Sequence, residues 1–151
     1  LSWGLAAACY PFLQEVAATI GRMLRVQPEM KLEQLLRKLT ESFGEKETVR
    51  RSVRYSLGLI QDLAFVYRTK KAGCYSASQP TRVTDADLAS WLIKTWFFAA
   101  GTANPMNRIA LANHPSLSFF DAPELISTAL KQGVLTVDRL SLSQDMVRLV
   151  G

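Results

Sequence analysis

Basic residues crowd one short stretch of the chain, between positions 46 and 71: Lys46, Arg50, Arg51, Arg54, Arg68, Lys70 and Lys71. Only Glu47 and Asp62 are acidic there, so the stretch carries a net charge of +5. The planar guanidinium of arginine donates two parallel hydrogen bonds, a geometry that suits phosphate oxygens and the edge of guanine. The chemistry that these residues predict is binding of a polyanion.

A helix over residues 46–64 is needed to position the first four of these side chains. Because an α-helix advances about 100° per residue, its apolar positions share one stripe: Val49, Val53, Leu57, Ile60, Leu63 and Ala64, with Ser56 among them. Arg51, Arg54 and Tyr55 fall on the opposite side, and Arg50 lies on the border. The pattern predicts a helix that packs through aliphatic residues and presents arginines outward. The alternative is an ordinary core helix with a solvated basic face.

A β-hairpin with a basic tip is predicted to follow. Residues 65–67 are aromatic and β-branched, which favours a strand. Residues 70–73 contain Gly73, which adopts the positive φ of a tight turn easily, and residues 74–76 form the returning strand. Tyr67 and Tyr75 are expected to pack in the core or across the hairpin, with contact to a sugar-phosphate chain as the alternative.

Two further helices precede this stretch. Pro11 fits a first helical turn, and apolar residues recur at helical spacing to about Val26. A second amphipathic helix covers residues 31–42 and ends at Gly44. A helix, a short glycine-containing turn and a basic helix make a helix-turn-helix.

In the order of these elements and in the placement of charge, residues 12–78 resemble the winged-helix superfamily, winged helix-turn-helix proteins with three helices followed by a hairpin. The resemblance implies that the basic helix 46–64 enters the major groove of double-stranded DNA, with its N-terminal residues near the bases. The basic wing, 68–73, then contacts the backbone or minor groove. The DNA-binding residues it implies are Lys46, Thr48, Arg50, Arg51, Arg54, Tyr55, Arg68, Lys70 and Lys71, with Ser52 as a further short contact.

The second half differs in charge. Residues 1–80 carry 12 Lys/Arg and 7 Asp/Glu, whereas residues 81–151 carry 6 of each. The boundary coincides with the connector 78–81, so the predicted domains are a winged-helix unit, 1–80, and a helical unit ending in a hairpin, 81–151. Helix 86–100, capped by Thr84, is rich in aromatic residues. Its residues Trp91, Trp96 and Phe97 are assigned either to the core or to a protein interface.

The rest of the second half repeats the plan of the first. A short helix over 105–112, a turn with His114 as turn or cap residue, and a helix starting at Asp121 are expected. Strands 134–137 and 146–150 follow, around a loop at 141–144. This order predicts a second, degenerate winged-helix-like unit, mainly α with a small β-hairpin, that binds protein or packs on the first unit.

Composition narrows the function classes. Cys9, Cys74 and His114 are the only residues of their types, which argues against a metal site, a disulfide scaffold and His-dependent catalysis. No phosphate-binding glycine loop or nucleophile elbow is present, and no apolar run reaches membrane-spanning length. We therefore expect a non-enzymatic, cytoplasmic, nucleoid-associated protein without cofactor, metal or membrane partner. Its expected role is that of a bacterial-type regulator or an accessory subunit of a DNA-processing system, as a homodimer or in a larger complex. The alternative is a protein–protein assembly module that uses helix 86–100 as its interface.

Overall fold

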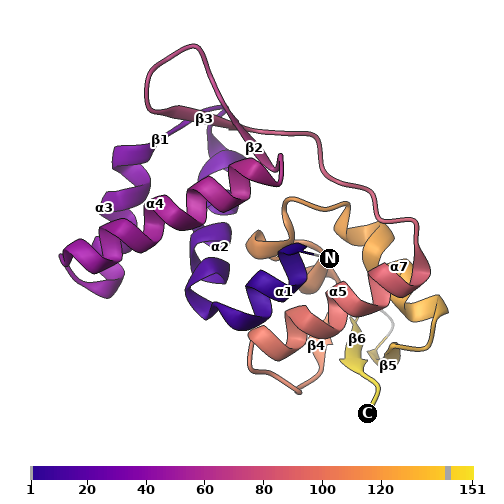
Figure 1. The fold of residues 1–151 in the computed structure, drawn as a ribbon. Coiled ribbons are helices and arrows are strands. Elements are labelled where there is room, and N and C mark those ends of the chain that lie inside the picture. Colours follow the sequence, from indigo (N-terminus) through magenta and orange to yellow (C-terminus); the bar gives the residue numbers. More distant parts are fainter. Residues whose placement is uncertain (1, 142–143) are drawn as a thin grey trace.

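The computed structural model describes residues 2–141 and 144–151, and it is mainly helical with two small antiparallel sheets (Figure 1). The helices are α1 (Ser2–Cys9), α2 (Pro11–Val26), α3 (Leu32–Phe43), α4 (Glu47–Asp62), α5 (Ala86–Ala99), α6 (Arg108–Ala112), the 3₁₀ turn η1 (Pro115–Leu117) and α7 (Ala122–Lys131). The strands are β1 (Met30–Lys31), β2 (Val66–Arg68), β3 (Cys74–Ala77), β4 (Met106–Asn107), β5 (Leu135–Ser141) and β6 (Gln144–Leu149). None of the described helices is both long and apolar enough to cross a bilayer.

The basic helix has the faces that its sequence predicts, but it is shorter. Val53, Ser56, Leu57 and Ile60 are buried along α4, which confirms the middle of the apolar stripe. Of its predicted ends, Val49 and Leu63 are half-buried and Ala64 is exposed. The helix ends at Asp62 rather than at residue 64. Ala64 adopts φ 61°, and its amide donates to the carbonyl of Gln61, while the amide of Phe65 donates to that of Ile60. Glycine usually occupies this left-handed position, so an alanine there gave no sign of the helix end.

The hairpin after α4 forms as predicted, with a register that separates its two tyrosines. Tyr67 lies opposite Ser76 and Arg68 lies opposite Tyr75, so the two tyrosines do not pair directly across the strands. Tyr75 is buried in the core, one of the two expected placements, whereas Tyr67 is exposed. Gly73 closes the turn with φ 70°. The two-residue strand β1 pairs with the other edge of β3, and it is too short for an alternating pattern to reveal it.

The second half follows the predicted order with shifted ends. Asp85, not Thr84, caps α5, because its carboxylate accepts a hydrogen bond of 2.7 Å from the amide of Leu88. The expected helix 105–112 is divided into β4 and α6. The final strands are longer than predicted, and loop positions 142–143 lie outside the described residues.

The two halves share one order of strands in their sheets. The first sheet has the order β1-β3-β2 and the second has the order β4-β6-β5. Each hairpin follows a helix, and a short strand from earlier in the same half completes each sheet.

A continuous core crosses the connector between the halves. The ring of Phe65, just after α4, stacks on that of Phe119 at 5.1 Å and meets Phe120 at 5.3 Å, while Trp3 of α1 lies against both Phe65 and Phe119. α1, which belongs to the predicted unit 1–80, packs against α5 of the other unit. The exposed connector therefore marks a change in surface charge above a shared interior.

Candidate nucleic-acid interface

The outer face of α4 carries the side chains that the sequence singled out. Thr48, Arg51, Arg54 and Tyr55 are exposed, and Tyr55 keeps 70% of its surface accessible. Lys46 is exposed at the N-cap position of α4. Five of the nine predicted contact residues therefore project toward solvent from the N-cap of α4 and the residues up to Tyr55.

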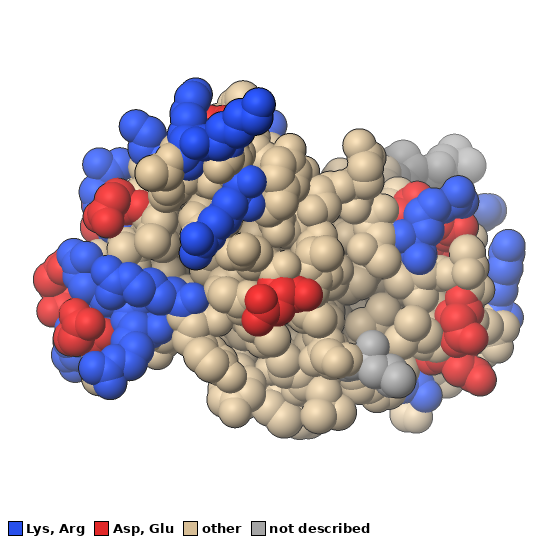
Figure 2. Space-filling model, turned by 45° about the horizontal axis from the view of Figure 1, so that its top comes forward, with Lys and Arg blue, Asp and Glu red and all other residues tan. Residues whose placement is uncertain are grey.

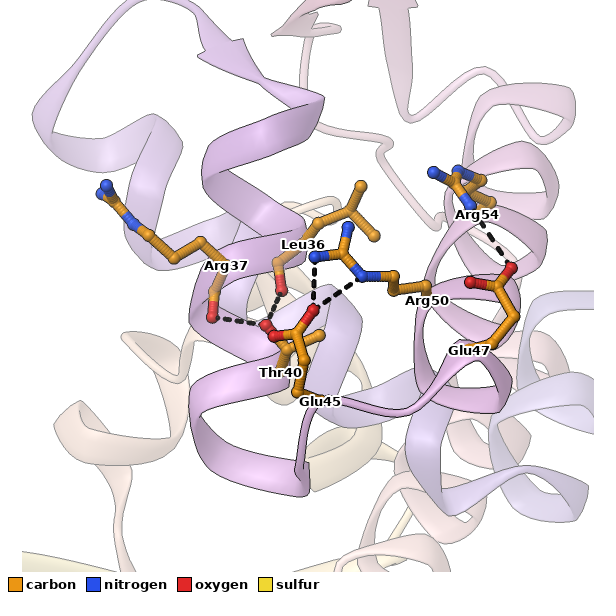
Figure 3. A network of polar contacts seen from close by, with 7 residues as sticks. All are labelled: Leu36, Arg37, Thr40, Glu45, Glu47, Arg50 and Arg54. Carbon is orange, nitrogen blue, oxygen red and sulfur yellow. Dashed lines mark hydrogen bonds and ion pairs between the residues drawn. The ribbon is translucent and has the colours of Figure 1, made fainter.

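Arg50 is held differently from its neighbours (Figure 3). Its Nε donates a 2.9 Å hydrogen bond to Oε1 of Glu45, in the turn between α3 and α4. This bond lowers the pKa of Glu45 and raises that of Arg50, so both groups stay charged. Arg50 therefore braces the turn rather than standing free for an external anion. A spacing of five residues across a turn is not one of the helical i,i+3 or i,i+4 pairs that a sequence pattern reveals.

Arg54 and Arg68 bring the helix and the hairpin together. Both line one hollow of about 180 Å³ between α4 and β2–β3, beside the buried Tyr75. The guanidinium of Arg68 lies 6.0 Å from the centre of the Tyr75 ring, at the outer range of a cation–π contact. Arg54 lies 4.0 Å from Glu47 in a solvent-exposed pair that restrains it weakly.

The hairpin tip adds two exposed lysines. Lys71 forms an ion pair of 3.3 Å with Glu29, which precedes β1. Lys70 has no hydrogen bond or ion pair within residues 2–141 and 144–151. The tip is thus positive, with half of its lysine charge opposed by a carboxylate.

These groups occupy one side of the molecule. Figure 2 shows Lys and Arg side chains gathered over the part that contains α3, α4 and the β2–β3 hairpin, with a largely uncharged band between it and the other half. Acidic side chains lie among the basic ones rather than apart from them. The surface therefore offers several separate cations. Among the predicted contact residues, Lys46, Arg51, Arg68 and Lys70 form no ion pair with a carboxylate of the described residues.

The aromatic residues of α5 mostly belong to the core. Trp96 and Phe97 are 5% and 1% exposed. Trp91 is half-buried, and its ring lies so close to Gly4 that an added Cβ would stand 2.2 Å from it. In this conformation Trp96 and Phe97 cannot form the protein interface that was the alternative to core packing, whereas Phe98, which the sequence did not single out, is 74% exposed.

His114 caps a 3₁₀ turn, as the sequence predicts. Its Nδ1 accepts from the amide of Ser116 at 3.3 Å and lies 2.8 Å from the Ser116 hydroxyl, which in turn accepts from Nε1 of Trp96 at 2.8 Å. Burial, followed by the charges of Arg22 and Arg25, lowers the pKa of His114. The imidazole is thus a neutral structural acceptor.

The described residues hold no group of three His, Cys, Asp or Glu side chains that could bind a metal ion. Cys9 is exposed and Cys74 is buried, and both are free thiols.

One feature that sequence reasoning missed is an apolar groove of about 310 Å³ beside the basic face of α4. Its walls come from α4 and from the start of α2, which stand about 40 residues apart in the sequence, so no local pattern could show it: Tyr10, Phe12, Leu13, Arg51, Ser52, Tyr55, Ser56 and Leu59.

Comparison with known proteins adds no further constraint, since no protein-family model, no curated protein and no solved structure matches this chain.

Proposed function

We propose that the chain is a non-enzymatic, double-stranded DNA-binding protein that uses α4 as a recognition helix and the β2–β3 hairpin as a basic wing. The observation that carries the proposal is the hollow shared by Arg54 of α4 and Arg68 of β2. It makes the basic helix and the basic hairpin parts of one surface, as a winged helix requires. A patch split between opposite sides could not contact one duplex in this manner.

The order of elements supports a winged-helix assignment for residues 11–77. Helices α2, α3 and α4 precede the hairpin, and β1 joins its sheet. The turn at Gly44, where φ is 97°, separates α3 from α4 in the place expected for a helix-turn-helix. The corresponding order in the second half supports a second winged-helix-like unit, whose role we infer to be support of the first.

Within this proposal the contact residues divide into two groups. Phosphate contacts, which give affinity but no sequence preference, come from Lys46, Arg51, Arg68, Lys70 and Lys71. Thr48, near the helix N-terminus, and Arg54 are placed to approach base edges. Duplex DNA is favoured over duplex RNA, because the major groove of A-form RNA is too narrow to admit a helix.

Fluorescence anisotropy with a labelled random-sequence duplex, titrated at several salt concentrations, tests the proposal. The decisive variant replaces Arg51, Arg54 and Arg68 together by Gln. Its matched control replaces Lys94, Arg108 and Lys131 by Gln. These three cations of the other half form no ion pair or side-chain hydrogen bond within the described residues, and both variants lose the same charge.

We expect wild-type affinity to fall with a log–log salt slope of about −3 to −6. The first variant should lose roughly 2 of that slope, for the phosphate contacts of Arg51 and Arg68, and at least about tenfold in affinity at ~0.1 M salt. The control should retain most of both. Equal losses of affinity in the two variants would mean that binding depends only on net charge and would contradict the proposed surface. Absence of wild-type binding at low salt would overturn the proposal.

A further inference from the structure

The groove between α2 and α4 has a closed floor and aromatic walls. Leu13 and Ser56 are buried at its base. Tyr10 and Tyr55 line it with 60% and 70% of their surfaces accessible, and Phe12, also in the lining, meets Phe43 edge-on at 5.2 Å between ring centres. Large aromatic side chains left open around a concave apolar surface are typical of a ligand or partner site.

The rim of the groove carries a positive charge without a counter-ion. Within residues 2–141 and 144–151, the guanidinium of Arg51 has no hydrogen bond, ion pair or ring contact. The neighbouring Glu45 and Glu47, the nearest acidic residues in sequence, are paired with Arg50 and Arg54 instead. Ser52, one residue beyond Arg51, lines the same groove with its hydroxyl also unpaired in the described chain.

We propose that this groove binds a small organic acid, with an apolar or aromatic ring system against Phe12, Tyr55 and Leu59 and a carboxylate on Arg51. Charge complementarity selects the acid, because Arg51 is the charged group of the lining and accepts carboxylates in a bidentate manner. A volume of about 310 Å³ is at the small end of ligand pockets. It therefore favours a compact two-ring molecule over an extended peptide.

Direct titration in the absence of DNA tests this inference. The probe is 2-naphthoate, and its neutral match is 2-naphthamide, which has the same rings without the charge. Two-dimensional amide NMR of the ¹⁵N-labelled chain reports both the affinity and the location of binding. A compact ligand of this size is expected to bind with a dissociation constant on the order of 0.1–1 mM.

Three variants make the test specific. Arg51→Gln removes the proposed carboxylate partner, and Arg37→Gln removes an exposed helix arginine outside this groove as the matched control. Ser52→Trp fills the groove from an exposed position, so folding should be retained. The NMR spectrum of each free variant verifies its fold.

Naphthoate should shift the amides around Arg51, Tyr55 and Leu59. Arg51→Gln should weaken naphthoate binding at least fivefold and leave naphthamide unchanged, and Ser52→Trp should abolish both. The inference is overturned if acid and amide bind equally, if the shifts lie elsewhere, or if Arg37→Gln has the same effect as Arg51→Gln. It is also overturned if only an acidic amphipathic peptide shifts these amides, since the groove is then a protein-docking site.

Occupancy of the groove has a consequence that rests on the proposed function. Arg51 and Tyr55 belong both to the groove and to the DNA-facing side of α4, so naphthoate should compete with the duplex. Because ligand binding is measured without DNA, a failure to bind DNA leaves the ligand result intact and can be distinguished from it.

Discussion

The β2–β3 and β5–β6 hairpins stand at corresponding places in the two halves, but their charges are arranged in opposite ways. Across residues 66–77 the first hairpin has three basic residues and no acidic one. In the second, Arg148 pairs with Asp138 at 3.0 Å and Arg139 pairs with Asp145 at 3.6 Å, each across the two strands. The second hairpin neutralises its own cations, whereas in the first Lys71 pairs with Glu29 and the other two basic residues have no carboxylate partner in the described chain.

The helices that precede the two hairpins also differ in exposure: α4 is open to solvent and α7 is largely covered. α4 exposes seven residues along its length, including Arg51 and Arg54, whereas α7 exposes only Pro123 and Lys131. α7 is covered because it packs against α5 and also contacts α6 and β5. The same order of elements therefore gives one half an open, charged face and the other a role in the interior. Charge and coverage, rather than topology, distinguish their surfaces.

The largest effect on stability is expected from disrupting the contact between α2 of the first half and η1 of the second, called the joint below. A Cβ at Gly21 of α2 would stand 2.2 Å from the carbonyl oxygen of Pro115 in η1. Gly21→Ala forces these segments apart, and overpacking of this kind costs about 1–3 kcal/mol of unfolding free energy. Urea unfolding followed by circular dichroism and by tryptophan fluorescence measures this loss.

Gly58→Ala is the control for that experiment. Apart from its chain neighbours and the backbone of α4 itself, no atom lies within 4 Å of a Cβ at this helical glycine, so the change should stabilise the chain by about 0.5–1 kcal/mol. Two separate wild-type transitions, or unchanged stability of Gly21→Ala, would show that the halves fold independently of this contact.

The next largest effect concerns DNA binding, where replacing the unpaired Arg51 should have different consequences from replacing Arg50, which is bonded to Glu45. Arg51→Gln should lower DNA affinity at every salt concentration and reduce the salt slope by about 1, as for the loss of one phosphate contact. Arg50→Gln should change the slope less, because Arg50 is already bonded to Glu45, and should instead lower the unfolding midpoint slightly. The same anisotropy and urea titrations measure both, and equal slopes for the two variants would contradict this distinction.

The smallest effect is a pH dependence at the joint. His114 belongs to the second half, but Arg22 and Arg25 of α2 help to lower its pKa, after burial itself. Because its folded pKa lies below the ordinary value of about 6.5, the unfolded chain takes up the proton first. Stability should therefore be full above about pH 7 and decrease as the pH falls from about 6.5 toward the lowered pKa of the folded state.

His114→Asn should abolish this dependence while keeping an acceptor at the cap of η1. Thermal unfolding at pH 7.5 and pH 5.5 provides the comparison. The carboxyl groups of Glu45 and Glu124, whose pKa values are lowered by Arg50 and Arg82, titrate below this window. An equal decrease in wild type and variant would assign the pH effect to other groups.

Much of the local structure followed from the sequence. The helical period predicted that Val53, Leu57 and Ile60 face inward and that Arg51 and Tyr55 face outward. Glycines at positions 44 and 73 marked turns that do have positive φ. The predicted end of a helix was wrong where the terminating residue was unusual, as at Ala64, which takes a conformation that glycine usually adopts.

The sequence by itself determined where charge and apolar surface lie along each helix, because those properties repeat with the 3.6-residue period of a single segment. Only the tertiary structure decided which cations are free. It tied Arg50 to Glu45, brought Arg54 and Arg68 to one hollow, and set Phe12 beside Tyr55 to form the apolar groove. Contacts of this kind depend on distances of a few ångströms between segments far apart in the chain, and no local period encodes such distances.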